Sequence, residues 1–184
     1  MANKTIYMMV GAPASGKTTF AQEMATKSGA AYISRDEIRY IVTKSRKIDM
    51  EKEKYVLKAF CEEIIRQLKF KDMTFADATH TSPRSRFAFY HEIRNAAKEQ
   101  NLNPDDIDII PVVMEVPFEL CLERNAARSK EFQAPEEDMI NYYAKCTYPS
   151  KTVPDIEIKC FPVRYFYNPN TNVLESIDFK DNIL

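Results

Sequence analysis

The chain has 184 residues, of which 45% are hydrophobic and 29% are charged, and its formal net charge is −1. This composition excludes a disordered chain and predicts one globular domain that is large enough to bury a core. A net charge so close to zero also excludes a protein that is basic throughout, so any binding of nucleic acid must depend on a local patch.

The first apolar run of the sequence belongs to a predicted strand, so we expect no signal peptide. No stretch approaches the roughly 18 apolar residues of a membrane span, so we expect no membrane partner. The four cysteines are widely spaced and form no C-x-x-C pair, which argues against a zinc site and favours reduced thiols in the cytoplasm. They are Cys61, Cys121, Cys146 and Cys160.

The first predicted elements are a strand, a loop and a helix. Residues 5–10 are apolar after the first, as in a strand buried on both faces, and residues 19–25 favour a helix with Phe20 and Met24 on one face. The loop between them matches G-x-x-x-x-G-K-[ST], the phosphate-binding P-loop pattern. Its residues are Gly11, Ala12, Pro13, Ala14, Ser15, Gly16, Lys17 and Thr18.

This loop has the chemistry that a nucleoside triphosphate requires. Gly11 and Gly16 let the backbone approach phosphates closely, and backbone N–H groups and the helix N-terminus face the anion. We expect Lys17 to reach the β- and γ-phosphates and the Thr18 hydroxyl to take one Mg²⁺ position, with Thr19 beside them. A chance match in an ordinary turn is the alternative, but the strand and helix on either side favour a site for ATP and Mg²⁺.

Strands and helices then alternate along the chain. The first helix should end near Ser28 with Gly29 after it, while Ser82 and Pro83 mark the start of a later helix. Pro111 lies inside a predicted strand, which indicates an edge or a bulge. The expected strands cover residues 30–34, 73–78 and 107–114, with two short ones near 156–160 and 163–167. The expected helices cover residues 36–42, 51–70, 83–100 and 117–125, and a last one starts at 135.

This alternation predicts an α/β fold of the P-loop NTPase type, a three-layer sandwich in which helices cover both faces of a mostly parallel sheet. We expect a single domain over residues 1–184, with a helical lid at about 124–136 and a tail at about 149–184. Ligands of such sheets bind at the carboxyl ends of the strands, so the residues that follow each strand are the candidates for function.

Two acidic residues follow strands at this edge. Asp36 is a candidate general base for an attacking hydroxyl, although it could equally be the N-cap of the next helix. Asp77 could hold Mg²⁺ through water or position the acceptor, although Asp is also common in turns after strands. Thr79 and His80 come next, and the histidine either contacts the substrate or is hydrogen-bonded within its loop.

Basic residues gather around the same edge. Arg124 and Arg128 are four residues apart and are expected on one helix face, where they either neutralise the transferred phosphoryl group or form a solvated face paired with Glu123 or Glu131. Two further groups flank the acceptor side and predict an anionic acceptor. They are Arg35, Arg39, Lys44, Arg46 and Lys47 after the second strand, and Arg84 and Arg86 after the third.

Four stretches of residues 4–150 resemble the kinase domain of phage-type 5′-polynucleotide kinases. They are the P-loop, the run Arg-Asp-Glu-Ile-Arg at 35–39, the run from Asp77 to Arg86, and the segment 115–135. The resemblance implies transfer of the ATP γ-phosphate to a 5′-hydroxyl of DNA or RNA. It also implies a nucleic-acid 5′ end as partner, and the host cytoplasm as location if the chain is phage-encoded.

The resemblance assigns roles to particular residues. Asp36 matches the general base, Arg39 matches the contact to the 3′-phosphate of the acceptor, and Arg128 matches a lid arginine on the ATP phosphates. Thr79 and His80 match a Thr-Asn pair at the acceptor, so this chain has His where Asn is usual. From the 184 residues we also expect no phosphatase or ligase module of the kind that many members carry. The predicted catalytic residues are Lys17, Asp36 and Arg128, and the predicted acceptor residues are Arg35, Asp36, Arg39, Asp77, Thr79, His80 and Arg86.

Two other functions stay open from the sequence. One is a P-loop kinase that acts on a nucleotide, a modified DNA base or another small hydroxyl compound. The other is an NTP-binding switch that hydrolyses slowly. Acceptor-dependent release of ADP would separate a kinase from a switch, and transfer of labelled γ-phosphate to an oligonucleotide would separate the two kinases.

Overall fold

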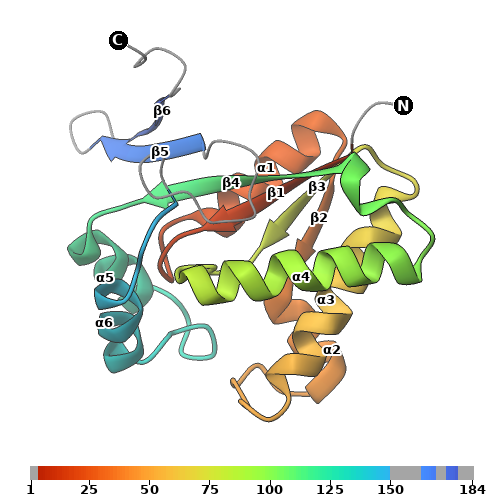
Figure 1. Cartoon of the computed structure of the whole chain (residues 1–184). Coiled ribbons are helices and arrows are strands. Elements are labelled where there is room, and N and C mark those ends of the chain that lie inside the picture. Colours follow the sequence, from red (N-terminus) through yellow and green to blue (C-terminus); the bar gives the residue numbers. More distant parts are fainter. Residues whose placement is uncertain (1–3, 150–162, 169–172, 178–184) are drawn as a thin grey trace.

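One sheet of six strands runs through the computed structural model, which describes residues 4–149, 163–168 and 173–177 (Figure 1). The strand order is β2-β3-β1-β4-β5-β6. The first five of these strands pair in parallel, and β6 is antiparallel to β5. The strands are β1 (Lys4–Val10), β2 (Ala31–Ser34), β3 (Met73–Asp77), β4 (Ile107–Glu115), β5 (Val163–Asn168) and β6 (Val173–Ile177).

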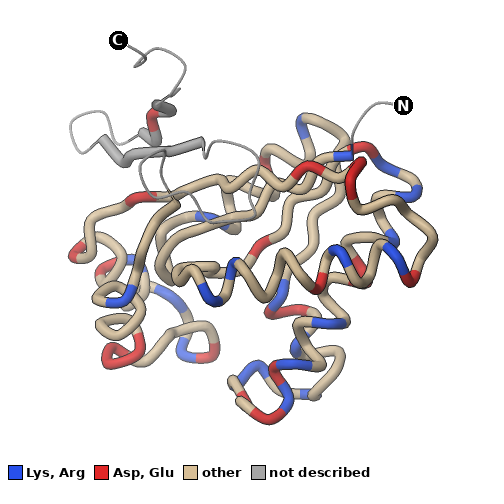
Figure 2. The backbone as a smooth tube through the Cα atoms, viewed as in Figure 1, with Lys and Arg blue, Asp and Glu red and all other residues tan. Residues whose placement is uncertain are grey.

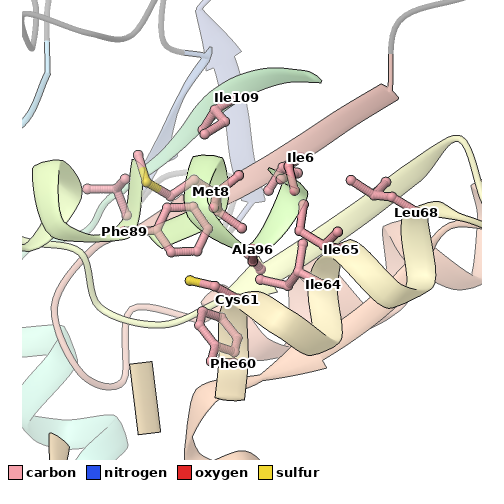
Figure 3. Close-up of a cluster of buried hydrophobic side chains, with 14 of the residues drawn as sticks. Ile6, Met8, Phe60, Cys61, Ile64, Ile65, Leu68, Phe89, Ala96 and Ile109 are labelled. Carbon is pink, nitrogen blue, oxygen red and sulfur yellow. The ribbon is translucent and has the colours of Figure 1, made fainter. Parts of the chain in front are cut away.

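Helices cover both faces of the sheet, and β1 contributes alternate residues to the two cores. Ile6 and Met8 pack with residues of α3 and α4 on one face, and Met9 packs with residues of α1 on the other. Figure 3 shows the first cluster, which includes Phe60 and Phe89. The expected α/β sandwich is therefore confirmed. The helices are α1 (Lys17–Ser28), α2 (Arg35–Thr43), α3 (Glu53–Leu68), α4 (Pro83–Glu99), α5 (Phe118–Ala126) and α6 (Glu136–Ala144), with a 3₁₀ turn at Pro104–Asp106.

Local sequence signals set the helix ends. Ser82 and Ser85 form a capping box at the start of α4, in which each side chain accepts the other's backbone N–H, and Pro83 is the first residue of the helix. Gly29 follows α1 with a left-handed φ of 70°. Both features are as the sequence predicts. The second helix starts one residue earlier than expected, because Ser34 is its N-cap.

The position of Pro111 in β4 fits the predicted edge. Pro111 is paired with Met8 of β1, whereas the pairing of β4 with β5 starts only at Val112. Among the described residues, Pro111 is thus paired with β1 on one side and with no strand on the other. On that unpaired side its missing N–H loses no hydrogen bond of the sheet. The strand expected near 163–167 is confirmed as β5, the strand expected near 156–160 lies outside the described residues, and β6 was not expected.

Candidate active site

The P-loop, residues 11–18, joins β1 to α1 at the carboxyl edge of the sheet. Gly16 is the N-cap of α1 and has a left-handed φ of 91°, which an L side chain rarely adopts. Gly11 is required for a different reason, because a Cβ atom there would lie 2.8 Å from the carbonyl oxygen of Met114 in β4. Gly16 is therefore needed for the tight turn, and Gly11 for the close approach of the loop to the neighbouring strand.

Lys17, the first residue of α1, is buried against the P-loop. Its Nζ donates to the carbonyl oxygen of Ala12 at 2.6 Å and to Ser15 Oγ at 3.4 Å. Burial lowers the pKa of Lys17, and the carboxylate of Asp77 acts in the opposite direction. The ammonium group thus lies along the same backbone that is predicted to hold the phosphates.

One carboxylate oxygen of Asp77 accepts two hydrogen bonds at the predicted metal position. Asp77, the last residue of β3, is buried, and its Oδ2 accepts hydrogen bonds from Thr18 Oγ1 at 2.7 Å and from the Tyr32 hydroxyl at 2.8 Å. Burial and the nearby Asp77 raise the pKa of Tyr32, so this hydroxyl stays a donor. The sequence analysis missed Tyr32, although its place on the strand beside β3 is a signal that could have found it.

The donors at Thr18 and Asp77 fit Mg²⁺. They are hard oxygen ligands, and Mg²⁺ usually keeps several waters and takes only one or two protein groups beside substrate phosphates. The described residues contain no group of three His, Cys, Asp or Glu side chains that could hold a metal.

On the acceptor side, the start of α2 presents Asp36. The Ser34 side chain accepts the N–H of Glu37 at 3.4 Å, so Ser34 caps the helix and the alternative that Asp36 is the N-cap is wrong. The Asp36 side chain is 74% exposed and forms an ion pair with Arg39 one turn later. Its carboxylate is thus open to solvent at the strand end where a base is predicted.

A partly buried carboxylate that is not among the predicted site residues is linked to Asp36 through Arg39. Glu53, the first residue of α3, accepts from Arg39 Nε at 2.6 Å and from a terminal nitrogen of Arg35 at 2.8 Å. Two guanidinium groups and the carboxylates of Asp36 and Glu53 therefore form a network with no net charge. Glu53 is 14 residues from Arg39 in the sequence, so no local pattern pairs them.

The loop after β3 contains two predicted acceptor residues, Thr79 and His80, and the structure corrects the second. Its Thr79 carbonyl accepts the N–H of Gly11 at 2.9 Å, which ties this loop to the P-loop. His80, however, is only 1% exposed, and its Nδ1 lies 3.0 Å from the Met9 carbonyl oxygen. Burial lowers the pKa of His80 to about 3. His80 is therefore a neutral side chain of the core and not a surface contact for the acceptor.

Arg86 is likewise buried and is not available to an acceptor. Its guanidinium donates to the carbonyl oxygens of His80 at 2.9 Å and Thr147 at 2.7 Å. The backbone N–H of Thr147 also donates to Thr81 at 2.9 Å. Arg86 thus fastens the chain that follows α6 to the loop after β3, which is a structural role.

The predicted lid, at about 124–136, contains the end of α5, the loop 126–133 and the start of α6. Arg124 lies in α5, but the helix ends at Ala126, so Arg128 lies beyond it and the two arginines do not share one helix face. Both still lie near the P-loop. A nitrogen of Arg124 is 3.9 Å from the position that a Cβ on Gly16 would take, and the charge of Arg128 helps to lower the pKa of Lys17, after the larger effect of burial.

The loop 126–133 is closed at its base by side-chain hydrogen bonds. Asn125 donates from Nδ2 to the Ala134 carbonyl at 2.8 Å and accepts the Ala134 N–H at 3.0 Å. Gln133 donates to the carbonyls of Ala126 and Arg128 at 3.0 and 2.7 Å. These bonds fix the backbone on which Arg128 stands.

Residues 6–149 match the model of one protein family, AAA_33, which is described as an AAA domain. No curated protein sequence matches the chain. No helix in the described part of the chain is long and apolar enough to cross a bilayer.

Several solved kinase structures are similar to the fold. A fungal RNA kinase is 15% identical, with 91% of this chain and 76% of that chain covered and a TM-score of 0.61. A sugar kinase from Janibacter sp. HTCC2649 is 17% identical, with 83% and 82% covered and a TM-score of 0.56. A chain of the Pnkp1/Rnl/Hen1 RNA repair complex is 23% identical with a TM-score of 0.59, and the match covers 79% of this chain but only 44% of that one. At these identities the likeness shows the fold alone.

Proposed function

Since the chain belongs to the AAA_33 family of P-loop kinases, which use ATP and Mg²⁺, we propose that it transfers the γ-phosphate of ATP to the 5′-hydroxyl of DNA or RNA. The observation that carries the transfer chemistry is the convergence of Lys17, Thr18 and Asp77 at the carboxyl edge of the sheet. These groups are an ammonium, a hydroxyl and a carboxylate, the set that phosphoryl transfer from a metal-bound triphosphate requires.

Each residue of the site has a separate task in this proposal. Thr18 and Asp77 would hold Mg²⁺, which would neutralise phosphate charge. Lys17, Arg124 and Arg128 stabilise the negative charge that spreads over the transferred group, with backbone N–H groups of the P-loop. Because this charge develops during transfer, the arginines contribute most when the segment 124–136 closes over the triphosphate as a lid of the single domain.

Asp36 supplies the general base. Its carboxylate is exposed two residues after the end of β2 and is paired with Arg39 one helical turn later, so it can accept the proton of an approaching hydroxyl. Support for a nucleic-acid acceptor comes from the resemblance of the four motifs, from the exposed cations after β2, and from a fungal RNA kinase among the similar structures. Thr79 and Arg35 line the acceptor side in this proposal.

The Glu53 network favours a second candidate, a small neutral hydroxyl compound such as a sugar. Glu53 occupies both Arg35 and Arg39, so these arginines have less attraction for an acceptor phosphate than two unpaired arginines would have. A sugar kinase is also among the similar structures. For a polynucleotide, Arg39 would have to exchange part of its contact with Glu53 for the phosphate.

The test is transfer of labelled γ-phosphate to a panel of acceptors, namely 5′-hydroxyl DNA, 5′-hydroxyl RNA, nucleosides and sugars. We expect labelled oligonucleotides. Asp36→Asn should lower transfer by about a hundred- to ten-thousandfold and leave ATP affinity within a few-fold, because the base acts on the acceptor and not on ATP. The matched control is Glu37→Gln, an exposed neighbour in the same turn, which should stay active.

The possible results separate the candidates. Label on a sugar or nucleoside alone would select the small-acceptor kinase. Slow ATP hydrolysis that no acceptor accelerates would select a switch. An active Asp36→Asn protein would remove Asp36 from the chemistry whichever acceptor is used.

A further inference from the structure

Two segments far apart in the sequence meet at Arg46, in the connection between α2 and α3. The Arg46 guanidinium lies 5.4 Å from the ring centroid of Tyr40 in α2 and 4.9 Å from that of Phe132 in the loop 126–133. Its Nε also forms an ion pair with Glu131 Oε1 at 3.5 Å. The guanidinium thus joins the acceptor side of the molecule to the predicted lid.

The two rings at this junction keep much of their surface in water. Tyr40 is 50% exposed and Phe132 is 51% exposed. A ring that stacks with an arginine and remains half exposed offers a flat platform on which a nucleobase can stack.

The charge around the rings is positive. Residues 38–48 contain no Asp or Glu but include Lys44, Arg46 and Lys47, and both lysines are exposed. The loop 126–133 adds the exposed Lys130, and its single carboxylate, Glu131, is paired with Arg46. Figure 2 shows blue segments in both loops, at the ends of α2 and α5. Cations next to exposed aromatic rings are the combination that single-stranded nucleic acid requires.

We propose that this surface binds single-stranded nucleic acid, with bases stacked on the two rings and phosphates held by the lysines. The proposal rests on the proposed function and deepens it, because it gives the place of the strand that follows the phosphorylated 5′ end. A duplex hides its base faces, so the surface favours unpaired ends. The residues of the surface are Tyr40, Lys44, Arg46, Lys47, Lys130 and Phe132.

The test measures binding separately from catalysis. The anisotropy of a 3′-fluorescein-labelled 5′-hydroxyl oligo(dT) 12-mer is titrated with the full chain at several salt concentrations. Tyr40→Ala should raise Kd between about fivefold and about a hundredfold without changing the salt dependence, because it removes stacking. Lys44→Ala/Lys47→Ala should lower the slope of log Kd against log salt by about 1.4, because each phosphate contact to a single strand contributes about 0.7.

The matched control is Lys69→Ala/Lys98→Ala, which removes two exposed lysines from the ends of α3 and α4 and should change neither Kd nor slope. The lysine variants leave packing intact, so they test the surface even if Tyr40→Ala does not fold. A wild-type chain that does not bind the strand would overturn the proposal. So would a duplex that binds as tightly, or a Kd that neither variant changes.

Failure of this proposal is distinguishable from failure of the proposed function. A strand that binds with these dependences but is never phosphorylated would contradict transfer and leave the surface in place. A strand that is phosphorylated with the same KM by the wild type and both variants would support transfer and exclude the surface.

Discussion

At the residue scale, Tyr32 gives the sharpest test of the metal position. Its hydroxyl and that of Thr18 donate to the same oxygen of Asp77, so Tyr32 holds the carboxylate in the orientation that aligns Thr18. We expect Tyr32→Phe to raise the Mg²⁺ concentration for half-maximal ATP turnover between about threefold and about tenfold, the effect of losing one hydrogen bond that contributes about 0.7–1.4 kcal/mol. Turnover at saturating Mg²⁺ should stay within about twofold.

Tyr7→Phe is the matched control for this prediction. Tyr7 lies on β1 and its hydroxyl is 3.9 Å from Met73 Sδ, so its removal leaves Asp77 untouched. If both variants show the same Mg²⁺ dependence, the Tyr32 hydroxyl has no part in the metal position.

Lys17 has the largest expected effect of a single side chain. We expect Lys17→Ala to lower kcat by at least about a hundredfold, the scale for one preorganised electrostatic contact in an active site. Circular dichroism should show that the fold survives, because the P-loop backbone is held by Gly11 and Gly16. A variant with near wild-type turnover would exclude the P-loop from the mechanism.

His80 makes stability depend on pH. Its folded pKa of about 3 is below the ordinary value of 6.5, so between these pH values the unfolded state binds more protons. The contribution of His80 to the free energy of unfolding is therefore fully present above about pH 6.5. Below that pH it falls by roughly 1.4 kcal/mol per pH unit. His80→Asn should remove this dependence, since Asn tolerates the local φ of 44° and its amide can still donate to Met9.

Thermal unfolding from pH 7.5 to 4.5 checks this expectation, with the exposed His91→Asn as control. An acid slope that persists in His80→Asn would assign the dependence to other groups. The variant leaves a smaller side chain against Phe89, so a lower Tm at pH 7.5 is expected as well.

The residues that could be predicted well are those whose role depends on their neighbours in the sequence. The P-loop pattern encodes its own conformation within eight residues, and Asp77 ends a strand that is visible from its apolar run. Glu53 could not be predicted, because its partners Arg35 and Arg39 come from another element. Tyr32 could have been found only from its place on the strand beside β3. His80 and Arg86 were misplaced because a polar side chain after a strand can turn inward as easily as outward, and only the packing decides.

At the element scale, the loop 126–133 depends on Asn125. Asn125→Ala removes both hydrogen bonds to Ala134, and we expect local opening of the loop to become easier by about 1.4 kcal/mol. Trypsin should then cleave after Arg128 or Lys130 about tenfold faster under native conditions. The KM for ATP should rise as well, since Arg128 stands on this loop.

Asn95→Ala, at an exposed position in α4, is the control for proteolysis. Unchanged cleavage in Asn125→Ala would mean that the loop is held by other contacts. The position of one helix end explains why this region was predicted only in part. Arg124 and Arg128 have helical spacing, but the helix stops at Ala126, where no residue signals the end as Gly29 does after α1.

At the scale of the whole molecule, the family match ends at residue 149, yet the sheet continues. β5 covers the outer edge of β4 at Val112–Glu115. We expect a chain truncated after residue 149 to have a lower Tm and to self-associate, because an unpaired edge of apolar residues is a template for another strand. A truncation after residue 177, which keeps β5 and β6, is the control. Size-exclusion chromatography decides, and a monomeric 149-residue chain with unchanged Tm would contradict the prediction.

The bonds of Arg86 and Thr81 to Thr147 determine how the predicted lid can move. The chain leaves the sheet at the end of β4 and is hydrogen-bonded again at Thr147, so both ends of the segment 117–146 are fixed. We therefore expect this segment to open by a hinge rotation about the line through its two fixed ends and not by sliding. We therefore expect a substitution at Arg86, which would release one of these fixed ends, to alter how Arg124 and Arg128 approach ATP in the proposed reaction.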